Sequence, residues 1–563
     1  NYSINRNYNP FYYNAESLDN RTISDLYVLN DGSASSVGTV GSEYLSYNES
    51  SKDVSSMYYA QATLNYSHNW GPHAVSGMLT GLMQSQTEGN SDSLAKSLPH
   101  KNEGLSGRFT YGYNDKYLLS ASLRKDGSSN FGINHKWGYF PSISAGWILS
   151  EEPFMESLKS VANNVKLRFS WGEAGNDAIP AFGYLTTIQY GTNYVLGTDQ
   201  SIVTGTSLQK PANPDLKWET DEQIDAGLDL SLFNDKVTVT ADYYVKNTRG
   251  MLVSLPVSME SGFLNAPTIN GGRIKNSGME LSVDYKVHLG KLNLDINGNL
   301  ATLKNVVKSL GVGQPIVGGA SIPNMSAITY TEVGQPIGYF RGYLVQGVYQ
   351  TDAEVNKTTQ PGAVAGDLIY KDVNGDGQLT DADRVKLGTP WPKLTYGLNM
   401  TASYNGFDFN LFLQGIHGSQ IFDANKASNY QMKYFNGNGI VNGVAAVLHH
   451  WTPGSGINNQ PGLKFTDGNG NYTNPSSFFV ESGDFMRVRN VQLGYTIPSG
   501  TFGKVSNVLQ GVRVYVSAQN LFTFTGYSGF DPEVGSTDPM GAGIDTGVYP
   551  QPRTFLAGVD INF

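Results

Sequence analysis

The sequence has no cysteine and carries little charge for its length. None of its 563 residues is Cys, and Asp, Glu, Lys and Arg together make up 15%, against about 25% in ordinary soluble domains. The lack of cysteine excludes a disulfide scaffold and a thiolate metal site. The net charge of −10 argues against a nucleic-acid partner, because nucleic-acid-binding proteins present a basic face.

Long hydrophobic runs are also missing. No stretch approaches the run of about 18 apolar residues that a membrane-spanning helix needs. The first residues, NYSINRNYNPFYY, contain no basic segment followed by an apolar core, so they do not read as a signal peptide. The chain is therefore either cytosolic or the carboxy-terminal part of something longer. We favour the second interpretation because of the strand pattern.

What the sequence has in abundance is alternation of apolar and polar residues, which predicts β-strands. In residues 224–232, for example, Ile, Ala and Leu alternate with Asp, Gly and Ser. About fifteen segments of this kind occur, and they begin near residues 57, 74, 105, 116, 140, 163, 222, 236, 276, 291, 393, 407, 485, 511 and 554. Their length of about ten residues suits tilted strands that cross a bilayer.

The connections between these segments alternate strictly between short and long. The short links are 68–73, 114–115, 151–162, 234–235, 289–290, 405–406 and 498–510. The long links are 83–104, 125–139, 173–221, 248–275, 304–392, 418–484 and 522–553. All short links then lie on one side of the sheet, as in outer-membrane barrels with short periplasmic turns and long extracellular loops. The strands of a soluble β-sandwich also alternate apolar and polar residues, but a sandwich does not require short and long links to alternate in this way.

We therefore predict an all-β fold, a transmembrane antiparallel β-barrel with about 15–16 strands in this chain, apolar outside and water-filled inside. The inward residues include Asp225, Asp229, Asp284 and Asp295. Residues 57–563 form the barrel, and residues 1–56 hold an upstream strand or strands and a loop, with one strand expected within 1–47. The final strand, TFLAGVDINF, is expected to close the sheet and to place Phe563 in the aromatic girdle at the membrane surface.

Seven segments, taken in order, resemble the SusC/RagA-type TonB-dependent transporters of the Bacteroidetes outer membrane. They are NVKLRFSWGEAGN (164–176), NPDLKWET (213–220), NSGMELSVDY (276–285), GQPIGYFRGYLVQGVYQT (334–351), GDLIYKDVNGDGQLTDADRVKLGTPWPKLTYGLNM (366–400), DFMRVRNVQLGYTIP (484–498) and RTFLAGVDINF (553–563).

This resemblance implies a 22-stranded barrel with an amino-terminal plug, a TonB box, and a SusD-like lipoprotein lid. It implies import of oligosaccharides or peptides, with glycans slightly favoured, driven by the TonB–ExbB–ExbD complex. The sequence lacks the plug, the TonB box and the early strands, so contact with TonB would run through a missing amino-terminal part. Outer-membrane lipid surrounds such a barrel, and a dimer of transporter–lid pairs is left open.

The motif DVNGDGQLTDAD, residues 372–383, matches a calcium loop within the long loop 304–392. Carboxylate, amide and carbonyl oxygens on alternate residues are the hard ligands that Ca²⁺ prefers. The expected ligands are Asp372, Asn374, Asp376, Gln378, Thr380 and Asp383. We predict a structural Ca²⁺ at the base of this loop. The alternative is an Asx-rich turn that binds nothing.

No catalytic motif or cofactor-binding loop is recognisable, so we do not expect an enzyme. Trp218, Trp391 and Trp451 could stack on sugar rings, although loop packing is the commoner role of such residues. Two other functions remain open. One is a passive porin, which polar lumen residues alone would permit, and the other is a surface-binding or hydrolytic protein built on a barrel.

Overall fold

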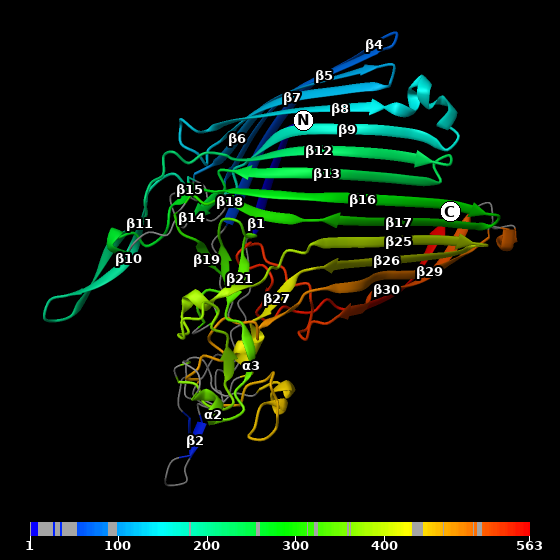
Figure 1. Ribbon diagram of the computed structural model, residues 1–563. Coiled ribbons are helices and arrows are strands. Elements are labelled where there is room, and N and C mark those ends of the chain that lie inside the picture. The colour runs from blue at the N-terminus through cyan, green and yellow to red at the C-terminus, as the bar shows by residue number, and fades with distance from the viewer. Residues whose placement is uncertain are drawn as a thin grey trace.

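The computed structural model describes residues 2–9, 26–28, 34–36, 53–87, 98–179, 182–254, 259–311, 313–319, 322, 325–356, 360, 362–430, 443–464, 467–498, 500–503 and 509–563. One long, curved antiparallel sheet forms the wall of the molecule, and folded connections project from one end of it (Figure 1). In the part of the chain described, no helix has the length and apolar character needed to span a membrane.

The wall is a 17-stranded sheet. Its strands are β1 (Tyr2–Asn9), β4 (Asp53–Trp70), β5 (His73–Thr87), β6 (His100–Tyr113), β7 (Tyr117–Ser128), β8 (Trp137–Ile148), β9 (Ala162–Asn176), β12 (Glu219–Leu232), β13 (Val237–Arg249), β16 (Arg273–Leu289), β17 (Leu292–Thr302), β18 (Lys304–Ser309), β25 (Leu394–Tyr404), β26 (Phe407–His417), β29 (Phe485–Ile497), β30 (Gly511–Thr525) and β32 (Thr554–Asn562). Strand β18 continues β17, because both pair with β16.

Each wall strand pairs with the next wall strand along the chain, so the sheet is a simple meander. All fifteen predicted strands are present, which confirms the predicted fold class. Strand β1 lies antiparallel to β4, upstream of the first predicted segment. The remaining residues between β1 and β4 lie mostly outside the described part of the chain.

The short links lie at one end of the sheet and the long connections at the other, as predicted (Figure 1). Positive φ angles make the tight turns possible, and asparagine, aspartate and glycine tolerate them best. Asn405 and Gly406 have φ of 49° and 88°, and Asn114 and Asp115 have φ of 51° and 55°. The link between β8 and β9 is formed by two short 3-10 helices, η2 (Leu149–Glu151) and η3 (Pro153–Leu158).

The long connections are folded. They contain the strands β2 (Leu26–Val28), β3 (Ala34–Ser36), β10 (Thr187–Leu196), β11 (Ser201–Lys210), β14 (Leu252–Ser254), β15 (Thr268–Asn270), β19 (Ile316–Gly318), β20 (Thr329–Thr331), β21 (Tyr339–Gly342), β22 (Val345–Val348), β23 (Leu368–Tyr370), β24 (Val385–Gly388), β27 (Gln420–Asp423), β28 (Val480–Ser482) and β31 (Ile544–Asp545). Their helices are α2 (Asp352–Val355), α3 (Asn425–Asn429), η4 (Met259–Ser261), η5 (Asp381–Asp383) and η6 (Ala445–His449).

The buried hydrophobic clusters lie in these connections rather than in the wall. One cluster joins Phe340, Phe422, Phe479 and Ile544, which come from three separate connections. A second contains Tyr343, Leu368, Tyr370 and Trp451. Strands β27, β28 and β31 also form one sheet from the last two of these connections. The connections after β18, β26 and β30 thus pack together as one unit, which we call the loop domain.

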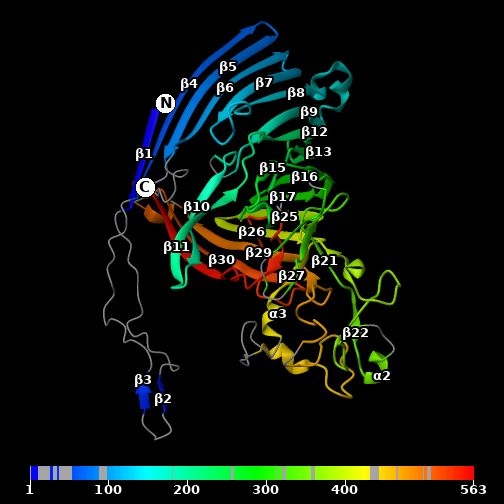
Figure 2. The same cartoon turned by 90° about the vertical axis from the view of Figure 1, so that its left-hand side faces the viewer.

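The carboxy-terminal strand β32 pairs with β30 along one side. Among the described residues no pairing joins its other side to β1, so the expected closure of the sheet is not made by these residues. The strands form a curved arc (Figure 2), and no pairing among the described residues closes it. Phe563 lies at the turn end of β32 and is 76% exposed.

Candidate transport path and loop domain

The convex face of the wall is apolar and exposed. Alternate residues on neighbouring strands present large hydrophobic side chains, such as Leu64, Leu79, Leu105, Phe109, Leu123, Ile143 and Phe169. At the turn end, Tyr113 stacks on Tyr117 at 6.3 Å between ring centroids, and Tyr117 stacks on Trp147 at 6.4 Å. An apolar band bordered by aromatic residues is the surface that a barrel presents to lipid.

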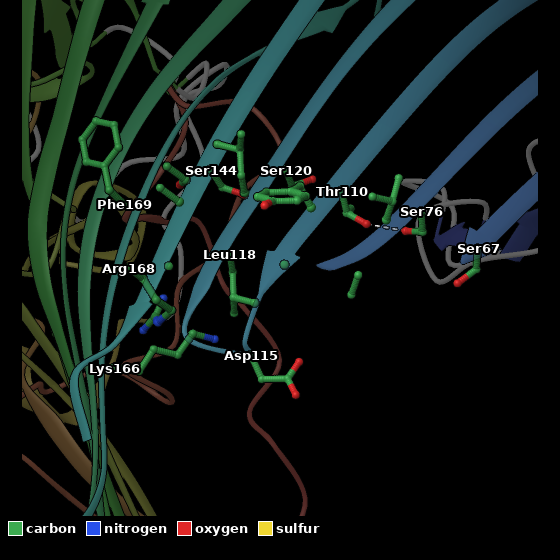
Figure 3. A pocket seen from close by; sticks show the side chains of 18 of the residues that line it. Ser67, Ser76, Thr110, Asp115, Leu118, Ser120, Ser144, Lys166, Arg168 and Phe169 are labelled. Carbon is green, nitrogen blue, oxygen red and sulfur yellow. Dashed lines mark hydrogen bonds between the residues drawn. The ribbon is translucent and has the colours of Figure 1, made fainter. Parts of the chain in front are cut away.

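The concave face carries a row of small hydroxyl side chains across the first strands. The register places them directly opposite one another on β4, β5, β6, β7, β8 and β9, and the row ends at Asp225 on β12 (Figure 3). We call Ser67, Ser76, Thr110, Ser120, Ser144 and Ser170 the hydroxyl row. It lines a cavity of about 510 Å³, whose edge includes Lys166 and Arg168. Because these side chains are short and polar, they leave a space beside the wall that water can fill.

Arg168 forms the main ion-pair cluster beside this cavity. Its Nε lies 2.8 Å from Oδ2 of Asp229 on β12, and its Nη2 lies 2.9 Å from Oδ1 of Asp242 on β13. The guanidinium crosses β12 at Gly227, where an added Cβ would lie 2.7 Å from Cζ of Arg168. Glycine at this position is therefore what allows one cation to reach two strands.

A second cluster near the carboxy-terminal strand has the same design. Arg513 on β30 lies 2.6 Å from Asp408 on β26 and 3.0 Å from Asp560 on β32. Gly494 on the intervening strand β29 makes room, because an added Cβ would meet both Asp408 and Arg513 at less than 3 Å. These pairs hold neighbouring strands together on the face opposite the lipid.

The predicted inward acids occupy this polar face. Asp229 is held by Arg168, Asp225 lines the cavity, and Asp284 lies 3.4 Å from Lys286. Asp295 stands opposite Lys286 in the register. The sequence analysis missed the arginine partners. The signal that could have revealed them is a glycine at an inward-facing position of one strand, with an arginine and an aspartate at the paired positions of the two neighbouring strands.

The loop domain is fastened to the wall by a buried charge cluster. Arg487, at the start of β29, lies 2.6 Å from Asp531 and also contacts Glu533, which in turn contacts Arg489. The side chain of Arg487 is 2% exposed. Burial raises the pKa of Asp531, but hydrogen bonds from the backbone of Gln551 and Glu533 and from Arg487 outweigh it, so that the pKa is lower than usual.

The six predicted calcium ligands lie in one loop between β23 and β24. Asp372 accepts hydrogen bonds from the N–H groups of Gly375 at 2.6 Å and Gly377 at 2.8 Å. Asp376 accepts one from Gln378. Asp383 is fully buried and accepts from Val373 and Thr380, at 2.9 and 2.8 Å.

The loop is therefore ordered by its own hydrogen bonds. In the described part of the chain, no three His, Asp or Glu side chains converge as a metal site requires. Each carboxylate oxygen has a second lone pair, so the ligand atoms are of the right kind, but Asp372 and Asp376 both accept hydrogen bonds from within the loop. Calcium binding stays a prediction.

The three tryptophans proposed for sugar stacking are engaged in packing. Trp218 packs against Phe131 and Phe140, with ring centroids at 5.2 and 5.5 Å, and its Nε1 donates to the backbone carbonyl of Lys136. Nε1 of Trp391 donates to the carbonyl of Ile337 at 2.6 Å. Trp451 is 8% exposed and belongs to the second hydrophobic cluster. These contacts favour the packing role.

Comparison with known proteins gives a consistent result. A family described as TonB dependent receptor-like, beta-barrel, matches residues 1–417. TonB-dependent receptor P3 of Formosa agariphila is 33% identical over 472 residues, which cover 81% of this chain and 45% of that protein. TonB-dependent receptor SusC of Bacteroides thetaiotaomicron is 29% identical over 468 residues, covering 81% of this chain and 43% of SusC.

Among solved structures, the RagAB peptide transporter superposes with a TM-score of 0.71 at 23% identity, covering 91% of this chain and 56% of that chain. At this identity the likeness shows the fold. The chain spans about half the length of the curated relatives it matches. The chain therefore belongs to the TonB-dependent receptor family, as a SusC/RagA-like β-barrel of the outer membrane.

Proposed function

We propose that this chain is the barrel wall of a transporter that imports oligosaccharides or peptides across the outer membrane, driven by TonB. The observation that carries the proposal is the contrast between the two faces of one sheet. Exposed leucine and aromatic side chains cover the convex face, while the hydroxyl row and the Arg168 and Arg513 clusters cover the concave face. Such a wall separates lipid from an aqueous path.

We propose that a SusD-like surface lipoprotein binds at the end of the wall where the long connections lie. The loop domain supplies a broad, ordered surface there, and the hairpin β10–β11 extends far from the wall (Figure 1). Its side chains Tyr190 and Tyr194 are 79% and 70% exposed. An isolated two-stranded hairpin is only marginally stable in water, so a partner that covers these rings would stabilise it.

Uptake by intact cells tests the proposal. Cells that express the complete protein should accumulate a labelled oligosaccharide or peptide, and loss of the proton-motive force or of TonB should abolish accumulation. Uptake that survives both treatments would favour the passive porin. Cleavage of polymer by the purified protein would instead favour a surface hydrolase.

A variant of the hydroxyl row tests whether this wall lines the path. Replacing Ser120 and Ser144 by leucine fills the space beside the wall, so we expect uptake to fall while the amount of folded protein in the outer membrane is unchanged. Leucine at Ala121, on the lipid-facing side of the same strand, is the matched control. Unchanged uptake in the double variant would place the path elsewhere.

A further inference from the structure

The lipid-facing side of the wall carries an unexpected group of cations at its loop end. Met279 and Tyr285 on β16 are 59% and 41% exposed on the apolar face. The unbroken register between β13 and β16 puts Arg273, Lys275 and Arg249 on this same face, with Arg249 directly opposite Arg273.

Strand β18 adds to this group. Lys304 stands opposite Ser277 of β16, and it therefore shares the face of Arg273 and Lys275. Arg273 and Lys304 are exposed and Lys275 is half-buried. We call Arg249, Arg273, Lys275 and Lys304 the outer cation cluster.

The cluster is not neutralised by the protein. Glu222 and Glu173, its nearest acids on this face, are both in contact with Arg249. Among the described residues no acid lies within ion-pair distance of Arg273, Lys275 or Lys304. Like charges directly opposite one another destabilise a strand pair, so the unpaired cations are placed for an anion that comes from outside the chain.

The height of the cluster indicates which anion this is. Arg249 lies at the end of the 13-residue strand β13, and Val237 lies at the turn end. A rise of roughly 3.3 Å per residue and a tilt of about 40° place Arg249 about 30 Å above Val237. The apolar band of an outer-membrane barrel is about 25 Å tall. Arg249 and Arg273, which are directly opposite each other, are therefore level with the lipid headgroups of the outer leaflet. Lys304 stands opposite Ser277, which pairs with Val245, so its backbone lies about 10 Å lower, and its long side chain can extend up towards the headgroups.

A tryptophan lies just below Arg249, because Trp171 pairs with Ile224 and Ile224 pairs with Val245, four residues before Arg249. Trp171 shares the lipid-facing side with Ile224, and its Nε1 donates to Glu222 at 3.2 Å. Tryptophan at this height is typical of the aromatic girdle. Lysine and arginine are costly at the bilayer centre and nearly without cost at its surface, so four cations at the girdle fit an anionic headgroup.

We propose that the outer cation cluster binds the phosphate groups of a phosphorylated glycolipid of the outer leaflet. The acyl chains of the lipid lie against the apolar face below, beside Met279. The free amino and guanidinium groups of Arg273, Lys275 and Lys304 contact phosphate oxygens, and Arg249 is shared between the lipid and Glu222. This site is on the outside of the wall and is independent of what the protein imports.

Native mass spectrometry of the complete protein in detergent tests the site, with diphosphorylated lipid A as the probe. We expect the triple variant R273Q/K275Q/K304Q to bind lipid A more weakly by on the order of a hundredfold, since each basic residue near a membrane surface contributes about a fivefold factor. The matched control is Lys125→Gln. Lys125 also faces lipid, where it lies 4.5 Å from the ring of Trp137, and its loss should leave binding unchanged.

Two further binding measurements identify whether the bound phosphate belongs to a lipid or is free in solution. Lipid A without phosphates should not be retained, and inorganic phosphate at equal concentration should not displace diphosphorylated lipid A. Equal retention of the phosphate-free lipid, full displacement by inorganic phosphate, or undiminished binding by the triple variant would each overturn the proposal. Should the triple variant fail to fold, Glu222→Gln gives a second test. It removes an opposing carboxylate and should tighten binding several-fold, and unchanged or weaker binding would contradict the proposal.

Discussion

Arg487 donates a hydrogen bond from Nη2 to Oδ1 of Asp531 across 2.6 Å, and the two side chains are 2% and 5% exposed. The first residue belongs to the wall and the second to the final connection. Breaking a buried pair by removing one partner leaves an uncompensated charge. This contact is therefore a buried, charged link between the loop domain and the wall, and losing either partner should be costly.

We predict that Arg487→Met lowers the free energy of unfolding by about 3–5 kcal/mol. Urea unfolding of the protein in detergent measures it. The control is Arg124→Met, because Arg124 is 52% exposed and pairs with Asp126, and an exposed pair contributes about 1 kcal/mol or less. Equal effects of the two substitutions would show that burial does not strengthen the Arg487 pair.

The depressed pKa of Asp531 predicts an acid-sensitive attachment of the final connection. A carboxyl whose pKa is lower in the folded state contributes stability above its unfolded value, about 3.9, and this contribution is lost as the pH falls through the folded value. Hydrogen exchange in residues 526–553 should therefore accelerate below about pH 4. In Asp531→Asn the exchange should be faster at neutral pH and less dependent on pH. An unaltered pH profile in this variant would refute the assignment.

The close packing around Gly227 predicts that even a small added side chain at this position lowers the stability of the protein. An added Cβ would lie 2.1 Å from Oδ1 of Asp242 and 2.7 Å from Cζ of Arg168. Gly227→Val should displace the guanidinium and cost about 2–4 kcal/mol, measured as a lower melting temperature in detergent. Gly107→Val is the matched control, since nothing lies within 4 Å of its added Cβ and valine suits a strand. Similar melting temperatures for the two variants would disprove the role of Gly227.

Calcium should raise the melting temperature of the loop domain if the motif at 372–383 binds it. We predict that EGTA lowers this temperature and that the double variant Asp372→Asn/Asp376→Asn abolishes the response, because calcium prefers charged oxygen ligands. Asp381→Asn is the control, since Asp381 is outside the ligand positions and pairs with Arg341. If the melting curve is the same with calcium and with EGTA, the motif is an Asx-rich turn that binds no metal.

The strands could be predicted from the sequence because each one carries its own period-two pattern, as residues 224–232 do. The parity of the links was predictable because turns such as Asn405-Gly406 require residues that tolerate positive φ. Both signals are local. They also placed Asp225 and Asp229 on the polar face correctly.

The rest depends on contacts between distant residues. The pairing of Arg168 with Asp242 follows from the register of three strands and from the missing side chain at Gly227, and no local pattern specifies it. The packing of Phe340 against Phe422 joins two connections that have no common periodicity. Whether the acids at 372–383 converge on an ion depends on side-chain rotations that spacing does not determine.

The order of pairing in the wall bears on how the molecule is made. Because each strand bonds to its successor in the chain, a hairpin can form as soon as its two strands have emerged, with little loss of entropy on ring closure. Its open edge then offers unpaired N–H and C=O groups to the next hairpin. The hydrophobic cluster that joins Phe340 to Ile544 can form only after these distant strands are in place. We therefore expect the wall to assemble hairpin by hairpin and the loop domain to fold last.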